Sequence, residues 1–407
     1  MKERFICGLD VGTAKLCAVL GMLNSAGKLD VLAACMLPAY GIDAGKIKDS
    51  AKLCSCIREI CSRLSKMSGK KIKKVCVNID SMDLKVKACR TNLSFDRRVR
   101  ITRGRIDKLL SACFTAHNSP NRKIIHSFFN NFILDGETES EYPAGLLAGE
   151  LAADIVLVSE SIPTVDSLIE CVTTAGLALA GLLPSSCAQA LSLLKDGQER
   201  KSCVLVDVGA ALIKAAFLKG NAVRDIAILP GGAGNITRDI AAKLNVSWEN
   251  AERLKIEYGC ALAGQKAPGD KIIVKNNPAN RIISSQELNA VISARVDGLL
   301  RELKDCLLNS QYKDEDADSF IFTGGGAVQE GFLERAEQIL GRNVRLGILS
   351  AVQKRQIQTQ SAFYSTSIGL AQYGLTSKNN RTFPREIKFG CLQGLVKNAE
   401  GLYREYF

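Results

Sequence analysis

The feature of this 407-residue chain that most constrains its fold is a pattern that occurs twice. An apolar run ends in Asp-Val-Gly, a short turn follows, and a second apolar run begins. The copies read "CGLDVGTAKLCAVLG" from Cys7 and "VLVDVGAALIKAAF" from Val204, and a third apolar run follows each of them. Each copy therefore predicts a three-stranded meander, and two meanders in one chain indicate two halves of like fold.

Outside the two meanders, the chain alternates predicted helices and strands. Residues 84–160 are arginine-rich with polar turns, which favours a small inserted module. A stripe of leucine, valine and isoleucine at helical spacing predicts a long helix over 285–309. The other expected helices cover 49–66, 185–194, 235–244, 248–258 and 329–340, with one more beginning at Pro163, and further strands cover 75–79, 154–160 and 319–325.

The composition places the chain among globular proteins and limits its chemistry. It is 46% hydrophobic and 24% charged, it has no apolar run of the ~18 residues that span a bilayer, and its start shows no signal-peptide pattern.

The fifteen cysteines are scattered through apolar runs, so we expect reduced, buried thiols. Cys54, Cys56 and Cys61 have helical spacing and are interpreted as a buried helix face, with metal binding as the less favoured alternative. Because there are only two histidines, a zinc centre is not expected.

The net charge of +12 is concentrated in two basic stretches, residues 70–74 and 96–108. A basic surplus favours anionic partners such as phospholipid, nucleic acid or an acidic protein tail. Aromatic residues are not interleaved with the arginines, so we predict no nucleic-acid partner. A solvated basic face is the alternative interpretation.

The two meander turns carry the residue types of a phosphate site. A tight turn between strands aims successive backbone N–H groups at one point, and glycine permits close approach of a phosphate. Asp10 and Asp207 end the two strands and are expected to hold Mg²⁺ through water, while Thr13 and Lys15 add a hydroxyl and a cation. A third loop, "FTGGGAV" from Phe322, follows a buried strand and suits the sugar–phosphate end of a nucleotide.

These motifs resemble the actin-like ATPase superfamily and, within it, the FtsA family of bacterial cell-division proteins. The resemblance rests on "GLDVGTAKLCAVLG", "VLVDVG", "LPGGAGNITRDIAAKLNVSWENAERLKIEYG" and "IFTGGGAVQEGFLERAEQILGRNVRLG". It implies an α/β, actin-like two-lobed fold with duplicated ribonuclease-H-like domains and a small inserted subdomain. The implied division is a first lobe of residues 1–83, 161–199 and 345–376, an insert of 84–160, a second lobe of 200–344, a linker of 377–388 and an amphipathic helix of 389–407.

The same resemblance implies ATP and Mg²⁺ in the cleft between the lobes. The residues that it assigns to the nucleotide are Asp10, Gly12, Thr13 and Lys15 in the first phosphate loop, Asp207, Gly209 and Lys214 in the second, Gly232 in the glycine-rich segment, Glu252 and Lys255 near the nucleoside, and Gly324, Gly325 and Gly326 in the third loop.

The second loop departs from the family pattern. Where the family usually continues with glycine, threonines and an aspartate, this chain has Ala-Ala-Leu-Ile-Lys from Ala210 to Lys214. Leu183 also stands before Pro184, where actin-like proteins often carry an acidic residue that orients water. We therefore expect ATP to bind, with Lys214 meeting phosphate directly, and hydrolysis to be slow or absent. A pocket that keeps its fold without binding nucleotide is the alternative.

The closing segment, "KFGCLQGLVKNAEGLYREYF", has an apolar stripe at helical spacing and follows a polar stretch that looks like a tether. The stripe is expected to cover a membrane interface, with the protein's own core as the alternative. The resemblance adds that FtsA-like proteins end in a membrane-targeting helix. The residues expected at the membrane are Leu392, Leu395, Val396, Leu402, Tyr403, Tyr406 and Phe407.

Together these features favour a scaffold that polymerises on the cytoplasmic face of the inner membrane at the division site. By resemblance, its partners are further copies of the chain, anionic phospholipid, other division proteins and the C-terminal tail of FtsZ, which Arg281 and Arg295 are expected to contact. A PilM-like pilus-assembly protein is the alternative, because PilM shares the fold without depending on a terminal lipid-binding helix. A small-molecule kinase of the same fold is less favoured, because no acceptor site is evident.

Overall fold

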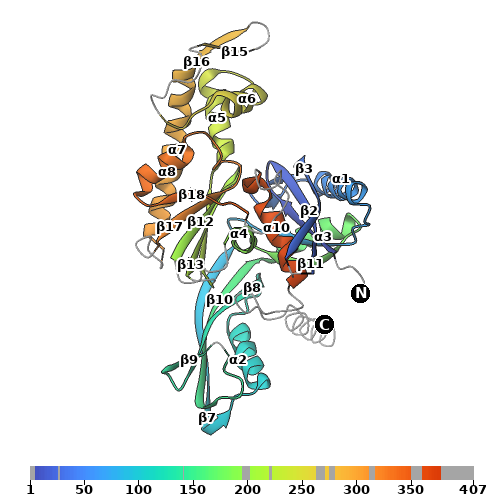
Figure 1. Ribbon diagram of the computed structural model, residues 1–407, viewed down its shortest axis with the longest axis vertical. Coiled ribbons are helices and arrows are strands. Elements are labelled where there is room, and N and C mark those ends of the chain that lie inside the picture. The colour runs from blue at the N-terminus through green and yellow to red at the C-terminus, as the bar shows by residue number, and fades with distance from the viewer. Residues whose placement is uncertain are drawn as a thin grey trace.

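Two lobes lie side by side in the computed structural model, and an elongated module extends below them (Figure 1). The structure describes residues 5–25, 28–140, 142–194, 202–219, 222–262, 271–274, 280–310, 317–349 and 360–376. The predicted linker 377–388 and the predicted membrane helix 389–407 lie outside the described residues. No helix in the described part of the chain is long and apolar enough to cross a bilayer.

The first lobe is built on a five-stranded sheet with the order β11-β6-β1-β2-β3. Three antiparallel strands form the predicted meander, and β6 and β11 extend it in parallel. The strands are β1 Phe5–Val11, β2 Lys15–Leu23, β3 Leu29–Pro38, β6 Lys74–Asn78 and β11 Ala178–Leu183. The short strands β4 Ile42–Asp43 and β5 Lys46–Ile47 pair beside this sheet, and α3 Ile162–Thr174 precedes β11.

The second lobe repeats this arrangement. Its sheet has the order β14-β13-β12-β17-β18, again an antiparallel meander that is extended by parallel strands. The strands are β12 Ser202–Val208, β13 Leu212–Lys219, β14 Ala222–Pro230, β17 Ser319–Thr323 and β18 Val344–Leu346. The prediction of two like-folded halves is thus confirmed, although β18 carries the second sheet to Leu346, just past the expected end at residue 344.

Helices with one apolar face complete the second lobe. They are α5 Ala233–Leu244, α6 Trp248–Tyr258, α7 Ser285–Leu308 and α8 Phe332–Leu340, and the hairpin of β15 Lys271–Val274 with β16 Arg281–Ser284 precedes α7. The side chains of Ser247 and Ser284 cap α6 and α7 by accepting N–H bonds from Asn250 and Glu287. The leucine stripe predicted on α7 is buried in the core of this lobe.

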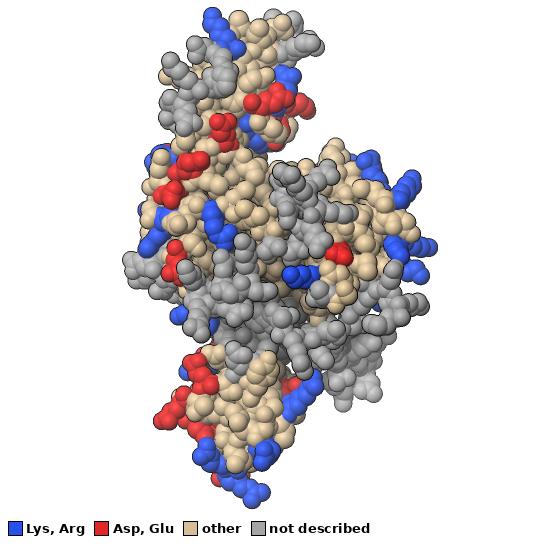
Figure 2. Space-filling view, in the orientation of Figure 1, with Lys and Arg blue, Asp and Glu red and all other residues tan. Residues whose placement is uncertain are grey.

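The inserted module has its own sheet, in the order β7-β10-β8-β9, and its own hydrophobic core. Its elements are β7 Lys85–Arg100, α2 Arg103–Ala116, β8 Arg122–Leu134, β9 Thr138–Ser140 and β10 Leu147–Ser161. Arg97, Arg98, Arg100 and Arg103 are exposed here. Figure 2 shows basic side chains at the lower tip of the molecule, over this module.

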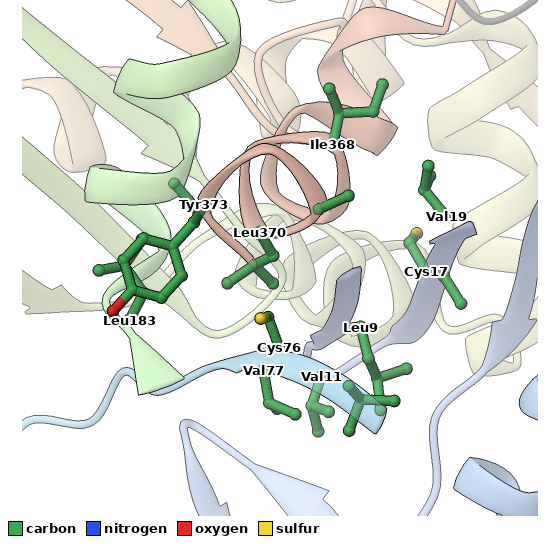
Figure 3. Packing of buried hydrophobic residues seen from close by; sticks show 14 of the residues in the cluster. Leu9, Val11, Cys17, Val19, Cys76, Val77, Leu183, Ile368, Leu370 and Tyr373 are labelled. Atoms are coloured by element: carbon green, nitrogen blue, oxygen red, sulfur yellow. The ribbon is translucent and has the colours of Figure 1, made fainter. Parts of the chain in front are cut away.

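Two helices enclose the sheet of the first lobe between them. The helix α10 Ser361–Thr376 packs on β1, β2 and α4 Ser185–Leu193, while α1 Ser50–Ser68 packs on β2 and β3. The Cys7 thiol forms a hydrogen bond with the thiol of Cys61 in α1, whereas the neighbouring Gly8 faces the backbone of α10. The two helices therefore cover opposite faces of the sheet. Figure 3 shows Ile368, Leu370 and Tyr373 of α10 packed among side chains of the sheet. The cysteine cluster at 54–61 is a buried face of α1, as predicted.

We expect one substitution to have opposite effects at two helix-interior glycines. A Cβ on Gly369 of α10 would lie 1.7 Å from the carbonyl oxygen of Ala188 in α4, whereas a Cβ on Gly298 of α7 meets nothing within 4 Å. Gly369→Ala should therefore destabilise the protein by roughly 1–3 kcal/mol through overpacking. Gly298→Ala, the matched control, should stabilise it by up to about 1 kcal/mol through helix propensity. Thermal unfolding followed by circular dichroism checks both; a shift of the two midpoints in the same direction would contradict this account of the α4–α10 contact.

Candidate functional site

The two Asp-Val-Gly turns have the same geometry. In the first, Gly12 N–H donates to the carbonyl of Lys15 at 3.1 Å, and in the second Gly209 N–H donates to the carbonyl of Leu212 at 3.0 Å. In both turns the last residue of the first strand pairs with the second residue of the next strand. These pairs are Val11 with Leu16 and Val208 with Ile213, so the two turns have the same register. The duplication seen in the sequence is a duplication of loop structure.

The third predicted loop lies directly against the second. Gly324 has a φ of +87°, and a Cβ there would lie 2.2 Å from a carboxylate oxygen of Asp207, so this contact requires glycine. Gly326 N–H donates to the carbonyl of Val208 at 2.9 Å. A Cβ on Gly325 would lie 3.9 Å from the ammonium of Lys15, which brings the first loop to the same place.

Lys15 is held at this meeting point by an aromatic ring. Its Nζ lies 3.8 Å from the centroid of Phe363, which stands near the start of α10. A cation over a ring face is attracted by the ring quadrupole. The loops that were predicted to bind phosphate are therefore brought together, with a lysine from the first lobe among them.

Lys214 is the centre of an ion-pair cluster between the lobes. Its Nζ lies 2.7 Å from Oδ2 of Asp207 on its own sheet and 3.8 Å from Oδ2 of Asp80, which follows β6 in the first lobe. The three side chains are only 12%, 7% and 5% exposed. Burial alone would lower the pKa of Lys214, but the attraction of Asp207, Asp80 and Asp10 outweighs it and raises that pKa, so the ammonium stays charged.

The surroundings of Asp10 destabilise the charged form of its carboxyl group. Although the residue keeps some exposed surface, the surrounding protein removes water from its carboxyl, and this desolvation raises its pKa to about 7 against the attraction of Lys214 and Lys15. The charges of Asp207 and Asp80 act in the same direction as desolvation. Asp10 therefore takes up and releases a proton near neutral pH.

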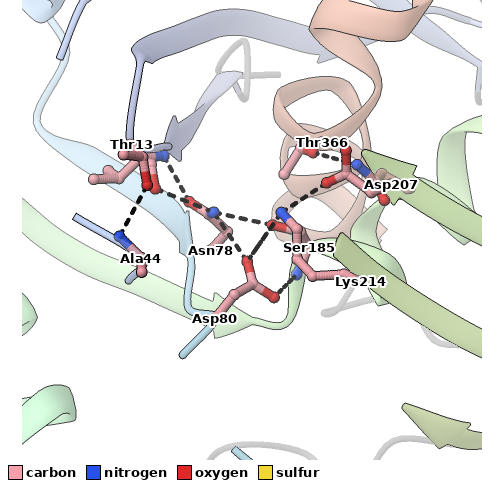
Figure 4. A network of polar contacts seen from close by, with 10 residues as sticks. Thr13, Ala44, Asn78, Asp80, Ser185, Asp207, Lys214 and Thr366 are labelled. Atoms are coloured by element: carbon pink, nitrogen blue, oxygen red, sulfur yellow. Dashed lines mark hydrogen bonds and ion pairs between the residues drawn. The ribbon is translucent and has the colours of Figure 1, made fainter. Parts of the chain in front are cut away.

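Asp80, Asn78 and Ser185 belong to this site, and the sequence analysis did not find them. Asp80 accepts hydrogen bonds from both the backbone N–H, at 3.0 Å, and the hydroxyl of Ser185, and Asn78 donates to the Ser185 hydroxyl at 3.0 Å. Figure 4 shows this network running from Asn78 through Ser185 and Asp80 to Lys214. A usable signal was present, since Asp80 follows a buried strand that is parallel to β1, and such strands end at the same edge of a sheet.

Two other predicted residues shape the loops. The Thr13 hydroxyl accepts the N–H of Ala44 at 3.1 Å, which ties the first loop to the β4–β5 hairpin (Figure 4). A Cβ on Gly232 would lie 2.3 Å from the carbonyl oxygen of Gly209. The amides at the start of α5 donate to the carbonyls of Gly209 and Ala210, so this helix terminus supports the second loop.

Glu252 and Lys255, which were expected near the nucleoside, lie on α6 and connect it to α5. Lys255 Nζ lies 2.7 Å from Glu252 and 2.8 Å from the hydroxyl of Thr237, with the lysine side chain almost fully buried. Glu252 keeps 40% of its side chain exposed. The contact of these residues with a nucleoside stays a prediction.

The two arginines that were expected to contact a partner are already engaged. Arg295 pairs with both carboxylate oxygens of Asp239 at 2.7 and 3.0 Å, which links α7 to α5. Arg281 donates to the carbonyl of Asn245 at 3.2 Å. Their role toward FtsZ also stays a prediction.

The residues present do not fit the Mg²⁺ site that was expected at Asp10 and Asp207. The carboxylate of Asp207 already contacts a buried ammonium whose charge is stabilised, and a divalent cation placed there would be repelled by it. Within the described residues, only one group of three side chains has ligand atoms close enough for a metal ion, and it lies elsewhere.

Comparison with known proteins agrees with this architecture. A family model described as "Cell division protein FtsA" matches residues 204–369, and one described as "SHS2 domain inserted in FTSA" matches residues 82–159. The cell division protein FtsA of Pseudomonas aeruginosa is 26% identical over 379 residues, which cover 93% of this chain and 91% of that protein.

Solved structures show the same fold at low identity. A PilM–PilN type IV pilus biogenesis complex aligns with a TM-score of 0.65 at 16% identity, over 91% of this chain and 98% of that chain. MreB 5 of Spiroplasma citri bound to AMPPNP aligns with a TM-score of 0.57 at 12% identity, over 93% and 98%. The fold is therefore the predicted actin-like one, and the insert is of the type found in FtsA.

The two matched models together span more than half of the sequence, and with these relatives they show that the chain belongs to the FtsA family of cell-division proteins.

Proposed function

We propose that the chain is a nucleotide-binding scaffold of the division apparatus. The observation that carries this proposal is the convergence of the two Asp-Val-Gly turns and the third glycine loop on Lys15 and Lys214. Two ammonium groups beside three tight loops give the positive charge and the close backbone approach that a polyphosphate site needs. MreB 5, a structural neighbour, was solved with AMPPNP, and we extend nucleotide binding to this chain, with ATP as the ligand.

We infer that ATP hydrolysis is slow or absent. Catalysis of phosphate transfer to water needs polar groups that orient the water and bond the terminal phosphate. At the corresponding places this chain has the alanines 210 and 211 and the buried Leu183, whose backbone carbonyl accepts the N–H of Ile79. Binding and release of ATP, with little turnover, would then regulate assembly.

Lys214 supplies the positive charge that a divalent cation supplies in a magnesium-dependent site. Its ammonium is anchored on Asp207 of the second lobe and faces Asp80 of the first, so it lies where the two halves meet. A phosphate group there would replace weak attraction to Asp80 by a direct charge-assisted hydrogen bond. Nucleotide binding is therefore proposed to need no Mg²⁺.

We further propose that copies of the chain polymerise on the cytoplasmic face of the inner membrane and tether FtsZ filaments there. Membership of the FtsA family supports a role in cell division with other division proteins. The membrane contact is argued from the sequence of 389–407 alone, whose apolar stripe would bind anionic phospholipid reversibly in one copy and firmly in a row of copies. The likeness to PilM is a likeness of fold, and the family comparisons favour the division scaffold over a pilus role.

The independence from Mg²⁺ can be tested with Lys214→Met, which removes the charge and keeps the length of the side chain. We expect the affinity of the unaltered protein for ATP to be the same in EDTA and in Mg²⁺. The variant should bind about ten- to a hundredfold more weakly in EDTA, the loss of a hydrogen bond to a charged group, and Mg²⁺ should restore part of this. Isothermal titration calorimetry measures both, with Lys219→Met at the exposed end of the same strand as the control. Loss of ATP binding by the unaltered protein in EDTA would exclude the role proposed for Lys214.

A second prediction follows from Asp10. The pKa of its carboxyl group is raised from 3.8 to about 7 in the folded protein. Acidification through this range protonates Asp10 and so removes a negative charge beside the proposed phosphate position. The affinity for ATP should therefore rise several-fold between about pH 8 and pH 6, with proton uptake on binding. In Asp10→Asn this dependence should disappear, leaving only the titration of the nucleotide itself, which both proteins share. Equal pH profiles for the two proteins would contradict this assignment.

The same shift predicts the effect of Asp10→Asn on stability. A carboxyl with a raised folded-state pKa is charged at a cost above that pKa, so its contribution to stability falls as pH rises from about 4 to about 7. The variant without nucleotide should thus gain more thermal stability at pH 8 than at pH 5. A gain that is larger at pH 5 would have the wrong sign.

The membrane proposal is tested by pelleting with liposomes that contain anionic phospholipid. The full chain should sediment with the vesicles, and a chain that ends at Arg385 should remain in the supernatant, because it lacks the apolar stripe. A full-length variant with Leu395 and Leu402 changed to Asp is the matched control for length. Equal sedimentation of all three would count against a membrane tether at residues 389–407.

A further inference from the structure

Three metal-ligating side chains meet in the inserted module, away from the cleft between the lobes. Cys89 lies on β7, Cys113 on α2, and His117 is the C-cap residue of that helix. The two Sγ atoms are 3.2 Å apart, Cys113 Sγ is 3.9 Å from His117 Nδ1, and one ligand atom from each residue lies within 4.8 Å of the others. This is the group that stands apart from the proposed nucleotide site.

The fold of the module explains why they meet. The helix α2 packs on β7, an edge strand of the sheet, and Cys89 is on the face that the helix covers. Cys113 and His117 are four residues apart, so they lie on one side of the last turn of the helix. Side chains that are 24 residues apart in sequence, Cys89 and Cys113, are thereby placed in contact.

The end of the helix adds a favourable field for a cation. His117 N–H donates to the carbonyls of Cys113 and Phe114 at 3.1 and 3.2 Å, which marks the end of α2, where the helix dipole is negative. Both thiols are free, Cys113 is buried, and Cys89 and His117 are half-buried.

We propose that Cys89, Cys113 and His117 form a zinc site with one open coordination position. Thiolate and imidazole ligands suit Zn²⁺, and two thiolates balance its charge inside a half-buried site. Tetrahedral Zn–S bonds of about 2.3 Å place two sulfurs roughly 3.8 Å apart, so the thiols need to separate by only about half an ångström. Three protein ligands leave the fourth position to water or to a donor atom from another molecule.

The binding step balances as an exchange of protons for metal. Each thiol loses its proton to solvent, so one Zn²⁺ replaces two protons and the site stays neutral. His117 Nδ1, which now contacts the carbonyl of Cys113 at 2.9 Å, moves its proton to Nε2 and ligates through the freed lone pair. That carbonyl keeps the backbone N–H of His117 as its donor. The metal then joins the edge strand β7 to the end of α2.

The experiment uses the full chain, prepared metal-free under a reducing agent and titrated with Co²⁺ as a spectroscopic stand-in for Zn²⁺. One equivalent should produce thiolate-to-metal charge-transfer absorption and the visible bands of tetrahedral Co²⁺, and Zn²⁺ should remove both. Cys89→Ser and Cys113→Ser should each abolish the signal. His117→Gln should keep the charge-transfer band but bind about ten- to a hundredfold more weakly.

Cys35→Ser is the control for the other thiols of this cysteine-rich chain, because Cys35 is a half-buried free cysteine in the first lobe. It should leave the cobalt signal unchanged, and circular dichroism should show that all four variants are folded. The proposal is wrong if the reduced chain gives no tetrahedral cobalt spectrum, or if the spectrum survives in either Cys89→Ser or Cys113→Ser. It is also wrong if the reduced chain binds no metal and the two thiols only form a disulfide in air, as peptide mapping by mass spectrometry would reveal.

Discussion

One buried ammonium, that of Lys214, lies between carboxylates of both lobes of this protein. Lys214 is bonded to Asp207 within the second lobe and faces Asp80 of the first, in surroundings that exclude most water. Charges in such a place are costly unless they are paired, so the position of Asp80 relative to Lys214 is strongly constrained. Asp80 is in turn held by Ser185 at the start of α4, and α4 is packed through Gly369 onto α10. Direct contacts thus connect Lys214 to the core of the first lobe.

This arrangement gives a physical reason for the altered second loop. Small and apolar residues replace the hydroxyls of the family pattern, and Ile213 packs into the core of the second lobe, so it does not fill the space between the lobes. The loop keeps its turn and its aspartate, and the lysine that follows adds a fixed positive charge. This departure agrees with the proposed function, in which the chain binds nucleotide with little turnover.

Much of the fold was predictable because it depends on local patterns. The apolar runs of the two meanders, the helices α6 and α7 and the stripe on α7 are properties of short segments, and the structure has them where they were expected. The contacts of Asp80 and of Cys89 were not predictable in this way, because parallel strand pairing and helix packing bring these residues to partners far along the chain. The small number of histidines argued against a zinc centre, yet a single histidine, His117, lies next to two cysteines that are distant in sequence. Similarly, the sequence places Lys214 seven residues after Asp207, but the approach of Asp80 to this lysine depends on how the two lobes pack.

A crystal structure of the protein with AMPPNP, grown in EDTA, tests the central claim most directly. The account predicts the phosphates between the Gly12–Lys15 and Gly209–Leu212 turns, with the ammonium of Lys214 in contact with a phosphate oxygen and the adenosine near the third glycine loop. A nucleotide bound elsewhere, or one that appears in the cleft only after Mg²⁺ displaces Lys214 from Asp207, would contradict it.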